Sequence, residues 1–398
     1  MNNMRSNEVC IKSLVIGLAA GIILMVIAVF GYTAYDRHVR WGGQIDPNRK
    51  VLEIYTLLNE VSIFPFDKAE MLENMYRGFL DGVGDPYTQY FDRLALEVFH
   101  ERTAGDFVGI GVLVMMDIDS GKVTIANPFR DSPAAQAGIL PGDQIVGVEG
   151  TDVVGRSLEE VISLIQGPEG SPVALTIFRP YENKYFDVDI IRARVAIPTV
   201  FHEMMSNQTG YIRLEGFNLV TRAQFQEALD DLVNQGMTSL ILDVRNNPGG
   251  VLDVVEYIAN RFVPEGIITY TVNANGQRRD FRSDANYLGI PLVVLINGRS
   301  ASASELLAGA IQDTGVGILI GEQTFGKGIV QHLYTLSDGS AVKTTVAEYF
   351  TPNGTSIHGI GVLPDLEVEM AESLSRRIGH LELEEDVQLR VALEWLSR

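Results

Sequence analysis

The sequence has a single cysteine, Cys10, among 398 residues, which excludes a disulfide framework or a cysteine-based metal site within one chain. Basic residues are also scarce, because 31 Lys and Arg stand against 51 Asp and Glu and give a formal net charge of -20 at pH 7. This balance argues against nucleic acid or an anionic membrane surface as a partner. The acidic residues Asp243 and Asp253 lack a His/Asp cluster at ligand spacing, so no metal and no other cofactor is predicted.

Apolar residues make up 46% of the chain, and its length favours more than one domain. Residues 13–35 carry no charge, and this run is long enough for a helix that spans a bilayer. We therefore expect a short cytoplasmic segment at residues 1–12 followed by a transmembrane helix at 13–35. The run lacks a clear small-x-small cleavage site, which favours an uncleaved anchor. Basic residues flank it on both sides, so charge alone does not set its orientation.

Three further regions follow from the pattern of apolar residues. Residues 44–100 show apolar spacing of three and four and are predicted helices, with a turn at GDPYTQYFD. Residues 101–182 change to short strands, with an amphipathic helix at 157–166. Residues 183–398 alternate strands and helices, a β-α-β order that favours a parallel sheet covered by helices. The C-terminal helix either packs on its own domain or lets the chain self-associate as a homo-oligomer.

Residues 297–331 contain a candidate nucleophile and a candidate base. An apolar strand at 292–296 leads to a turn, and a small-residue run containing Ser302 opens an apolar helix. A second strand leads to a glycine-rich loop that holds Lys327. A serine hydroxyl needs a base within hydrogen-bond reach, and a lysine serves when burial or neighbouring cations keep it neutral. The pair therefore suggests acyl transfer.

Rival interpretations of this stretch are weaker. GEQTFGKG almost fits a phosphate-binding loop, but Gly328 stands where a hydroxyl is required and a strand follows instead of a helix. A Ser-His-Asp triad is conceivable, although neither His332 nor His358 lies in a motif that would poise it as a base. Ser300 and Ser304 compete as nucleophile and are assigned to the turn and the helix cap. Glu305, on the first turn of the same helix, is expected to cap it or to bond backbone near the site.

The segments SASASELLAGA and GEQTFGKGIVQ resemble the signature of the C-terminal processing peptidases, a family of Ser/Lys proteases. The resemblance makes Ser302 the nucleophile and Lys327 the general base, and the separation of the two matches the family's pattern. It also implies that Gln331 orients the lysine and that Asp313 has only a supporting role at the site. The implied oxyanion hole consists of the N–H of Ala303 and one N–H from the pair Gly249 and Gly250.

The region around GILPGDQIVGVEG resembles a protease-associated PDZ domain, and an Asp-Pro-Tyr segment precedes it as in the family. Such a module pairs an extended peptide with an open sheet edge and captures its terminal carboxylate. The other wall of the groove is the predicted helix at 157–166. The expected carboxylate loop and edge strand comprise Phe107, Val108, Gly109, Ile110, Gly111 and Val112.

Together these inferences predict an α+β multidomain protein. It has an N-terminal membrane helix, a helical segment, a PDZ-like β domain and an α/β protease core of the crotonase-like or ClpP-like type. The predicted function is a membrane-anchored endopeptidase, with its catalytic part outside the cytoplasm, that acts on proteins or peptides with exposed C-termini. The alternative is a catalytically silent, membrane-tethered peptide receptor.

Overall fold

The computed structural model describes residues 22–29, 31–32, 35, 47–117 and 120–398. The predicted membrane span at 13–35 therefore lies partly outside the described residues, and the predicted segment at 1–12 lies wholly outside them. Residues 22–29 are helical and exposed. Among the residues that are described, no helix combines the length and the apolar character needed to cross a membrane.

The chain divides into two compact units, Met1–Met75 and Tyr76–Arg398. In the first unit, helix α2 (Pro47–Val61) has apolar residues at helical spacing, and Leu52, Ile54 and Leu57 are exposed. Helix α3 (Lys68–Asp81) begins in this unit and continues into the second. These helices agree with the predicted helical character of residues 44–100.

The second unit continues with strand β1 (Gln89–Phe91) and helix α4 (Arg93–Ala104). The Asp92 carboxylate accepts a hydrogen bond from the N–H of Ala95 and so caps α4 at its N-terminus. Gly105 ends the helix with φ 76°, a left-handed conformation that glycine adopts readily. Strand β1 was not predicted, because the sequence pattern at residues 84–92 indicates a turn.

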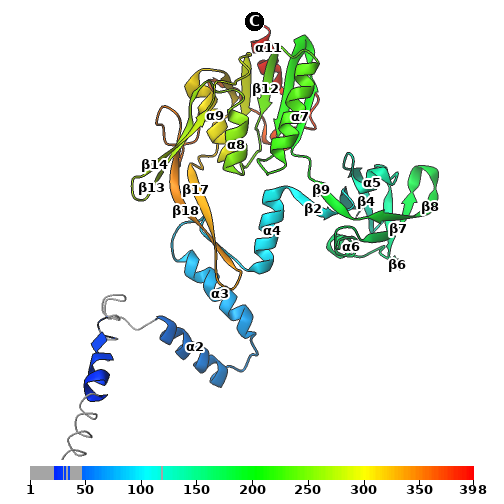
Figure 1. Cartoon of the computed structure of the whole chain (residues 1–398). Coiled ribbons are helices and arrows are strands. Elements are labelled where there is room, and N and C mark those ends of the chain that lie inside the picture. The colour runs from blue at the N-terminus through cyan, green and yellow to red at the C-terminus, as the bar shows by residue number, and fades with distance from the viewer. Residues whose placement is uncertain (1–21, 30, 33–34, 36–46, 118–119) are drawn as a thin grey trace, which may run out of the picture. The chain divides into compact units, whose positions relative to one another are not determined.

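A β domain comes next in the chain (Figure 1). Its main sheet has the order β3-β4-β5-β7-β8, with β6 paired to β5, and a separate pair joins β2 to β9. The bounds are β2 (Asp106–Gly109), β3 (Val112–Asp117), β4 (Lys122–Pro128), β5 (Gln144–Val148), β6 (Thr151–Asp152), β7 (Pro172–Arg179), β8 (Lys184–Ile191) and β9 (Ala193–Ala196). Helices α5 (Pro133–Gln136) and α6 (Leu158–Ile165) accompany the sheet, and buried apolar side chains such as Ile125, Val161 and Ile177 form its core. The sheet thus continues past residue 182 through β8.

A six-stranded sheet forms the centre of the C-terminal part, in the order β10-β11-β12-β15-β16-β19. Every neighbouring pair is parallel except β10 with β11. The strands are β10 (Val200–Met204), β11 (Thr209–Leu214), β12 (Ser239–Asp243), β15 (Leu292–Ile296), β16 (Ile318–Gly321) and β19 (Leu366–Glu367). The parallel sheet confirms the architecture expected from the β-α-β order.

Helices cover both faces of this sheet. Side chains of α7 (Thr221–Asn234), α8 (Leu252–Ala259) and α9 (Ala303–Thr314) pack with Leu240 and Leu242 in one core. Leu389 and Ala392 of α11 (Val387–Leu396) pack with Ile241, which points to the opposite face because side chains alternate along a strand. The C-terminal helix therefore packs on its own domain, while α10 (Glu372–Ser375) precedes it.

A second, antiparallel sheet has the order β1-β18-β13-β14, and β17 also pairs with β18. Its strands are β13 (Gly266–Asn273), β14 (Arg278–Ser283), β17 (Ile329–Thr335) and β18 (Ala341–Phe350). Short 3-10 helices occur at Pro180–Glu182 and Ser206–Gln208. The pairing of β1 with β18 attaches Gln89–Phe91 to the β17–β18 hairpin, which lies far along the chain.

Candidate active site

Three loops of the candidate site leave the carboxyl ends of neighbouring parallel strands. Residues 244–251 follow β12, residues 297–302 follow β15, and residues 322–328 follow β16. Open α/β sheets usually bind ligands at this edge. Because β12, β15 and β16 are adjacent, segments that are far apart in the sequence meet here.

Side-chain amides fix the first two loops to each other. The Asn297 side chain accepts a hydrogen bond from the N–H of Asn246 and donates another to the Asn246 side chain, both at 2.9 Å. The backbone carbonyl of Asn247 accepts hydrogen bonds from the N–H of Ala301, at 3.0 Å, and from the Ser304 hydroxyl, at 2.9 Å. The sequence pattern does not predict this role for Asn247 or Asn297, because local sequence does not reveal a pairing between loops.

The backbone at Ser302 is strained. Its φ of 55° and ψ of -111° lie in a region that side-chain-bearing residues rarely adopt, at a cost of about 1–3 kcal/mol. Ser302 directly precedes α9 and is partly exposed, whereas Ser300 and Ser304 are fully buried. The hydroxyls of these two donate to backbone carbonyls of the β12 loop. Of the three serines, Ser302 is the one available to a substrate.

The buried carboxylate of Glu305 joins the serine loop to the lysine loop. One of its oxygens, Oε2, accepts hydrogen bonds from the backbone N–H groups of Ser302 and Lys327, each at 2.8 Å. Its other oxygen accepts from the Thr324 hydroxyl and from the N–H of Gly326, each at 2.6 Å. Since both loop nitrogens bond to the same oxygen atom, Ser302 and Lys327 are held side by side at their backbones. This extends the predicted capping role of Glu305.

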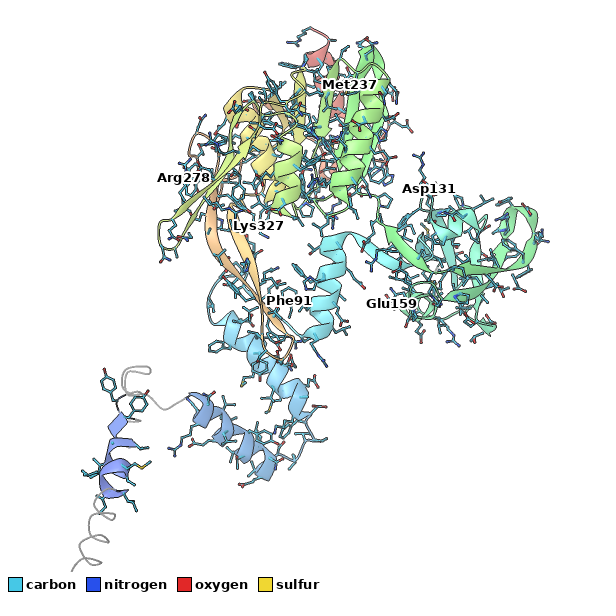
Figure 2. All side chains as sticks on the ribbon, viewed as in Figure 1. Phe91, Asp131, Glu159, Met237, Arg278 and Lys327 are labelled. Atoms are coloured by element: carbon cyan, nitrogen blue, oxygen red, sulfur yellow. The ribbon has the colours of Figure 1, made fainter. Side chains whose placement is uncertain are left out.

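Lys327 lies at the junction of the parallel sheet and the β17–β18 hairpin (Figure 2). Burial lowers the pKa of its ammonium group, although the negative charges of Asp85 and Glu305 act in the opposite direction. Its Nζ atom is 4.9 Å from the centre of the Tyr87 ring. A lysine with a lowered pKa is more readily neutral, which a general base must be before it can accept a proton.

The two glycines predicted for the oxyanion hole lie beside the serine loop. A Cβ on Gly249 would be 2.7 Å from the Ala301 carbonyl oxygen and 3.0 Å from the Ala303 nitrogen, so only glycine fits here. The N–H of Gly249 donates to the Asn247 side chain at 2.9 Å. The N–H of Gly249 is thus engaged by a side chain, and the predicted oxyanion hole stays a prediction. Gly250 has φ 152°, and a Cβ there would clash with the Phe217 carbonyl.

The remaining predicted residues have other partners. Gln331 donates a 2.6 Å hydrogen bond to the Tyr87 carbonyl, so the structure connects it to Lys327 through Tyr87. Asp313 lies near the C-terminal end of α9 and accepts a hydrogen bond from the N–H of Asn353, at the opposite end of the helix from Ser302. Both His332 and His358 are exposed.

The predicted peptide groove lies on the β domain. Residues of its expected loop and edge strand line a cavity of about 180 Å³ together with residues of α6; they are Phe107, Gly109, Ile110, Gly111 and Val112. Val108 does not line this cavity. The edge strand of the sheet that lines this cavity is β3, which begins at Val112, whereas residues 106–109 are paired with β9. The edge strand therefore starts where the predicted segment ends.

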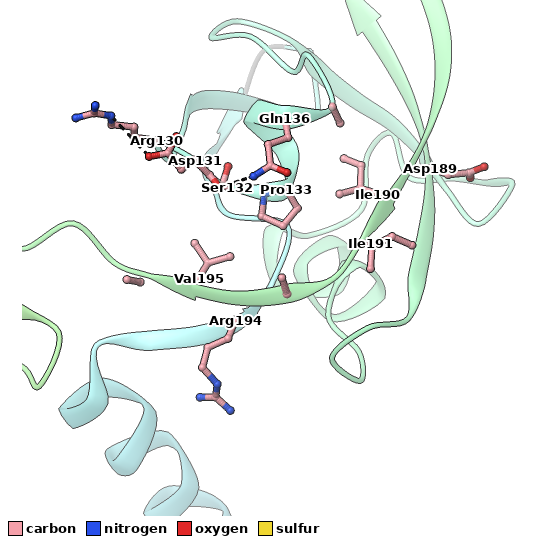
Figure 3. A pocket seen from close by; sticks show the side chains of 13 residues that line it. Arg130, Asp131, Ser132, Pro133, Gln136, Asp189, Ile190, Ile191, Arg194 and Val195 are labelled. Atoms are coloured by element: carbon pink, nitrogen blue, oxygen red, sulfur yellow. Dashed lines mark hydrogen bonds and ion pairs between the residues drawn. The ribbon is translucent and has the colours of Figure 1, made fainter.

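A second, larger cavity of about 540 Å³ lies on the same domain between α5, β8 and β9 (Figure 3). Charged side chains of both signs, among them Arg130, Asp131 and Arg194, surround it. None of the residues predicted for the peptide groove lines it. The two cavities are thus distinct features of the domain.

Comparison with known proteins identifies the family. The model of peptidase family S41 matches residues 208–368, and a PDZ domain model matches residues 124–179. The carboxy-terminal processing protease CtpB of Bacillus subtilis (strain 168) is 33% identical over 345 residues, which cover 85% of this chain and 71% of that protein. The chain belongs to peptidase family S41. Within the family, it groups with the carboxy-terminal processing proteases.

Two further relatives of this S41 chain illustrate the range of similarity. The chloroplastic C-terminal processing peptidase of Tetradesmus obliquus is 37% identical over 322 residues, covering 77% of this chain and 69% of that protein. The crystal structure of a putative S41 protease from Bacteroides fragilis aligns with a TM-score of 0.51 at 18% identity, covering 81% of this chain and 90% of that one. The second likeness concerns the fold alone. The family and its PDZ domain confirm the resemblance found in the sequence.

Proposed function

We propose that this S41 protein is a membrane-anchored serine endopeptidase in which Ser302 is the nucleophile and Lys327 the general base. The observation that carries the proposal is the Glu305 carboxylate, one oxygen of which binds the backbone N–H of both residues. Burial of the lysine supports the same assignment, because it favours the neutral amine. The uncharged run at 13–35 supports the anchor, and the family resemblance supports a catalytic part outside the cytoplasm.

The reaction begins with the neutral Lys327 amine, which accepts the proton of the Ser302 hydroxyl while the serine oxygen attacks the scissile carbonyl carbon. The N–H groups of Ala303 and Gly250 stabilise the negative charge that develops on the carbonyl oxygen. The lysine ammonium then returns its proton to the leaving amine, and an acyl-enzyme remains. Water, deprotonated by the same lysine, attacks the ester carbonyl; the C–O bond to Ser302 then breaks, the lysine ammonium returns its proton to the serine oxygen, and the new C-terminus leaves.

Substrate selection belongs to the PDZ domain in this proposal. The free edge of β3 and helix α6 enclose a groove in which an extended C-terminal segment can pair as an additional strand. The apolar lining of the cavity, including Ile110, Val114 and Ile162, favours nonpolar C-terminal residues. The parallel sheet with helices on both faces supports a protease core of the crotonase-like or ClpP-like type.

The test is cleavage of an unfolded protein with a nonpolar C-terminus by the full chain in detergent. Ser302→Ala and Lys327→Ala should each lower kcat by at least about a thousandfold, as in other hydrolases that lose a nucleophile or its base. Ser206→Ala and Lys184→Ala, at exposed positions, are the matched controls. Turnover by Lys327→Ala at the wild-type rate would exclude the Ser/Lys assignment. Binding without cleavage by the wild-type chain would instead favour the peptide receptor.

A further inference from the structure

The turn at residues 84–91 is far from the catalytic loops in the sequence, yet it is built into their neighbourhood. Strand β1 pairs antiparallel with β18, and Gln89 lies opposite Lys343. The hydroxyls of Thr88 and Thr344 are 3.0 Å apart and extend this junction. β18 also pairs with β17, where Thr345 lies opposite Gln331, and the Thr345 hydroxyl donates a hydrogen bond to Asp85 of the turn. The turn therefore reaches the part of β17 that follows Lys327.

Tyr87 contacts two residues that the family resemblance assigns to catalysis. Its ring face lies 4.9 Å from the Lys327 Nζ atom, within the range of a cation–π interaction. Its backbone carbonyl accepts the 2.6 Å hydrogen bond from Gln331. One residue of the turn therefore limits the positions available to both side chains.

Asp85 is held rigidly in the same turn. Its carboxylate accepts hydrogen bonds from the hydroxyls of Thr88 and Thr345, each at 2.7 Å, and from the N–H of Tyr87 at 3.0 Å. Burial disfavours its charged form, but these hydrogen bonds outweigh burial and lower the pKa of Asp85. The carboxylate is thus ionised at neutral pH and places a fixed negative charge near Lys327.

We propose that Asp85 and Tyr87 are positioning residues for the general base, with Tyr87 fixing Lys327 and Gln331 and Asp85 stabilising the ammonium form of Lys327. This inference rests on the proposed function. When Lys327 accepts the serine proton it becomes a cation in a partly buried site, where a nearby carboxylate stabilises charge more than in water. The Asp85 carboxylate thus stabilises the Lys327 ammonium ion as it forms during proton transfer.

Among the residues that the structure describes, the charged and titratable groups that act on or contact Lys327 are Asp85, Glu305, Lys343 and the Tyr87 phenol. Burial and the charge of Lys327 together lower the pKa of Lys343. Glu305 bonds to four donors that shape the loops, so its removal would disturb geometry as well as charge. Asp85 is the carboxylate whose charge can be changed without breaking the link between the serine and lysine loops.

The experiment compares kcat/KM against pH for the full-length wild type and Asp85→Asn. Without the carboxylate the pKa of Lys327 falls further, so the acid limb of the profile should move to lower pH by about one unit, the low end of the effect of a nearby charge. The plateau kcat should fall about tenfold, because the ammonium form loses its partner. Asp338→Asn, an exposed carboxylate at the tip of the β17–β18 hairpin, is the matched control and should leave the acid limb in place.

Tyr87→Ala and Tyr87→Phe test the ring. Tyr87→Phe keeps the ring face and should retain more of kcat than Tyr87→Ala, with KM similar in both. If Asp85→Asn loses activity while its acid limb stays at the wild-type pH, the residue is merely structural and the inference is wrong. The inference is also wrong if Asp85→Asn has the kcat and the acid limb of the wild type. Lys327→Ala separates the two proposals, since its inactivity would leave the Ser/Lys assignment standing even when the Asp85 inference fails.

Discussion

Replacing the buried Glu305 with glutamine tests whether its carboxylate holds the Ser302 loop and the Lys327 loop together. Each oxygen of the carboxylate accepts hydrogen bonds from two donors. Three donors lie on the loop at residues 322–328, and the fourth is the N–H of Ser302, the residue before α9. A glutamine side chain of nearly the same shape offers one oxygen and one NH2 group. Either orientation therefore leaves two donors facing the NH2 group.

The size of the effect follows from those two unsatisfied donors. A buried donor without an acceptor costs about 1–3 kcal/mol, so the native arrangement of the loops loses about 2–6 kcal/mol in Glu305→Gln. The two donors lost are either Ser302 and Lys327 or Thr324 and Gly326, because each pair shares one oxygen. If the loops rearrange while the rest of the domain stays folded, kcat/KM should fall at least about thirtyfold.

The assay is cleavage of an unfolded substrate, with thermal unfolding recorded in parallel. Glu227→Gln, on the exposed side of α7, is the matched control and should alter both measurements little. A Glu305→Gln protein with the kcat/KM and the melting temperature of the control would refute the reasoning. Such a result would mean that the four hydrogen bonds do not determine where Ser302 and Lys327 lie.

Further predictions concern the rest of the site and its support. Asp386→Ala should lower the free energy of unfolding by about 3–5 kcal/mol in urea denaturation, because it leaves the fully buried Arg245 with one carboxylate instead of two. The control Glu385→Ala, which removes an exposed ion pair with Arg377, should change the free energy of unfolding by less than about 1 kcal/mol. Gly249→Ala should abolish turnover by displacing Ser302, while Gly276→Ala, also at positive φ but with open space where the added Cβ would lie, should keep it. Equal activity of the two variants would argue against the close packing at Gly249. Activity of the wild type should be lost as pH falls through the lowered pKa of Lys327, because only the deprotonated amine is a base; a pH-rate profile that is flat to the acid side would contradict this.

The elements around the site were predictable where a local pattern determines them. The continuous apolar run at 292–296 matches β15, and the small-residue run after it matches α9, because these patterns reflect burial of one strand and one helix. Ser302 and Lys327 were assigned from their motifs, and their catalytic roles stay predictions. The hydrogen bond of Gln331 was not predicted, because its partner Tyr87 precedes the whole PDZ domain in the sequence.

Strand β1 shows why the rest could not be read from sequence. Its residues, Gln89–Phe91, carry no alternation long enough to indicate a strand, and they become one only through pairing with β18. The roles of Asn247 and Asn297 likewise depend on which strands are neighbours. Sequence patterns report local burial, whereas these contacts depend on strand order.

The electrostatics of the site follow from the same topology. A lysine buried without carboxylates would be neutral but would poorly hold the proton that it takes from serine, and a lysine paired closely with a carboxylate would stay charged. Here the effect of burial exceeds that of the two carboxylates, so the pKa of Lys327 is lowered. Asp85 and Glu305 act to raise this pKa through their charge, and their hydrogen bonds come from other donors. Because Asp85 comes from the turn before β1 and Glu305 from α9, this balance depends on the pairing of β1 with β18 as much as on the Ser302 and Lys327 loops.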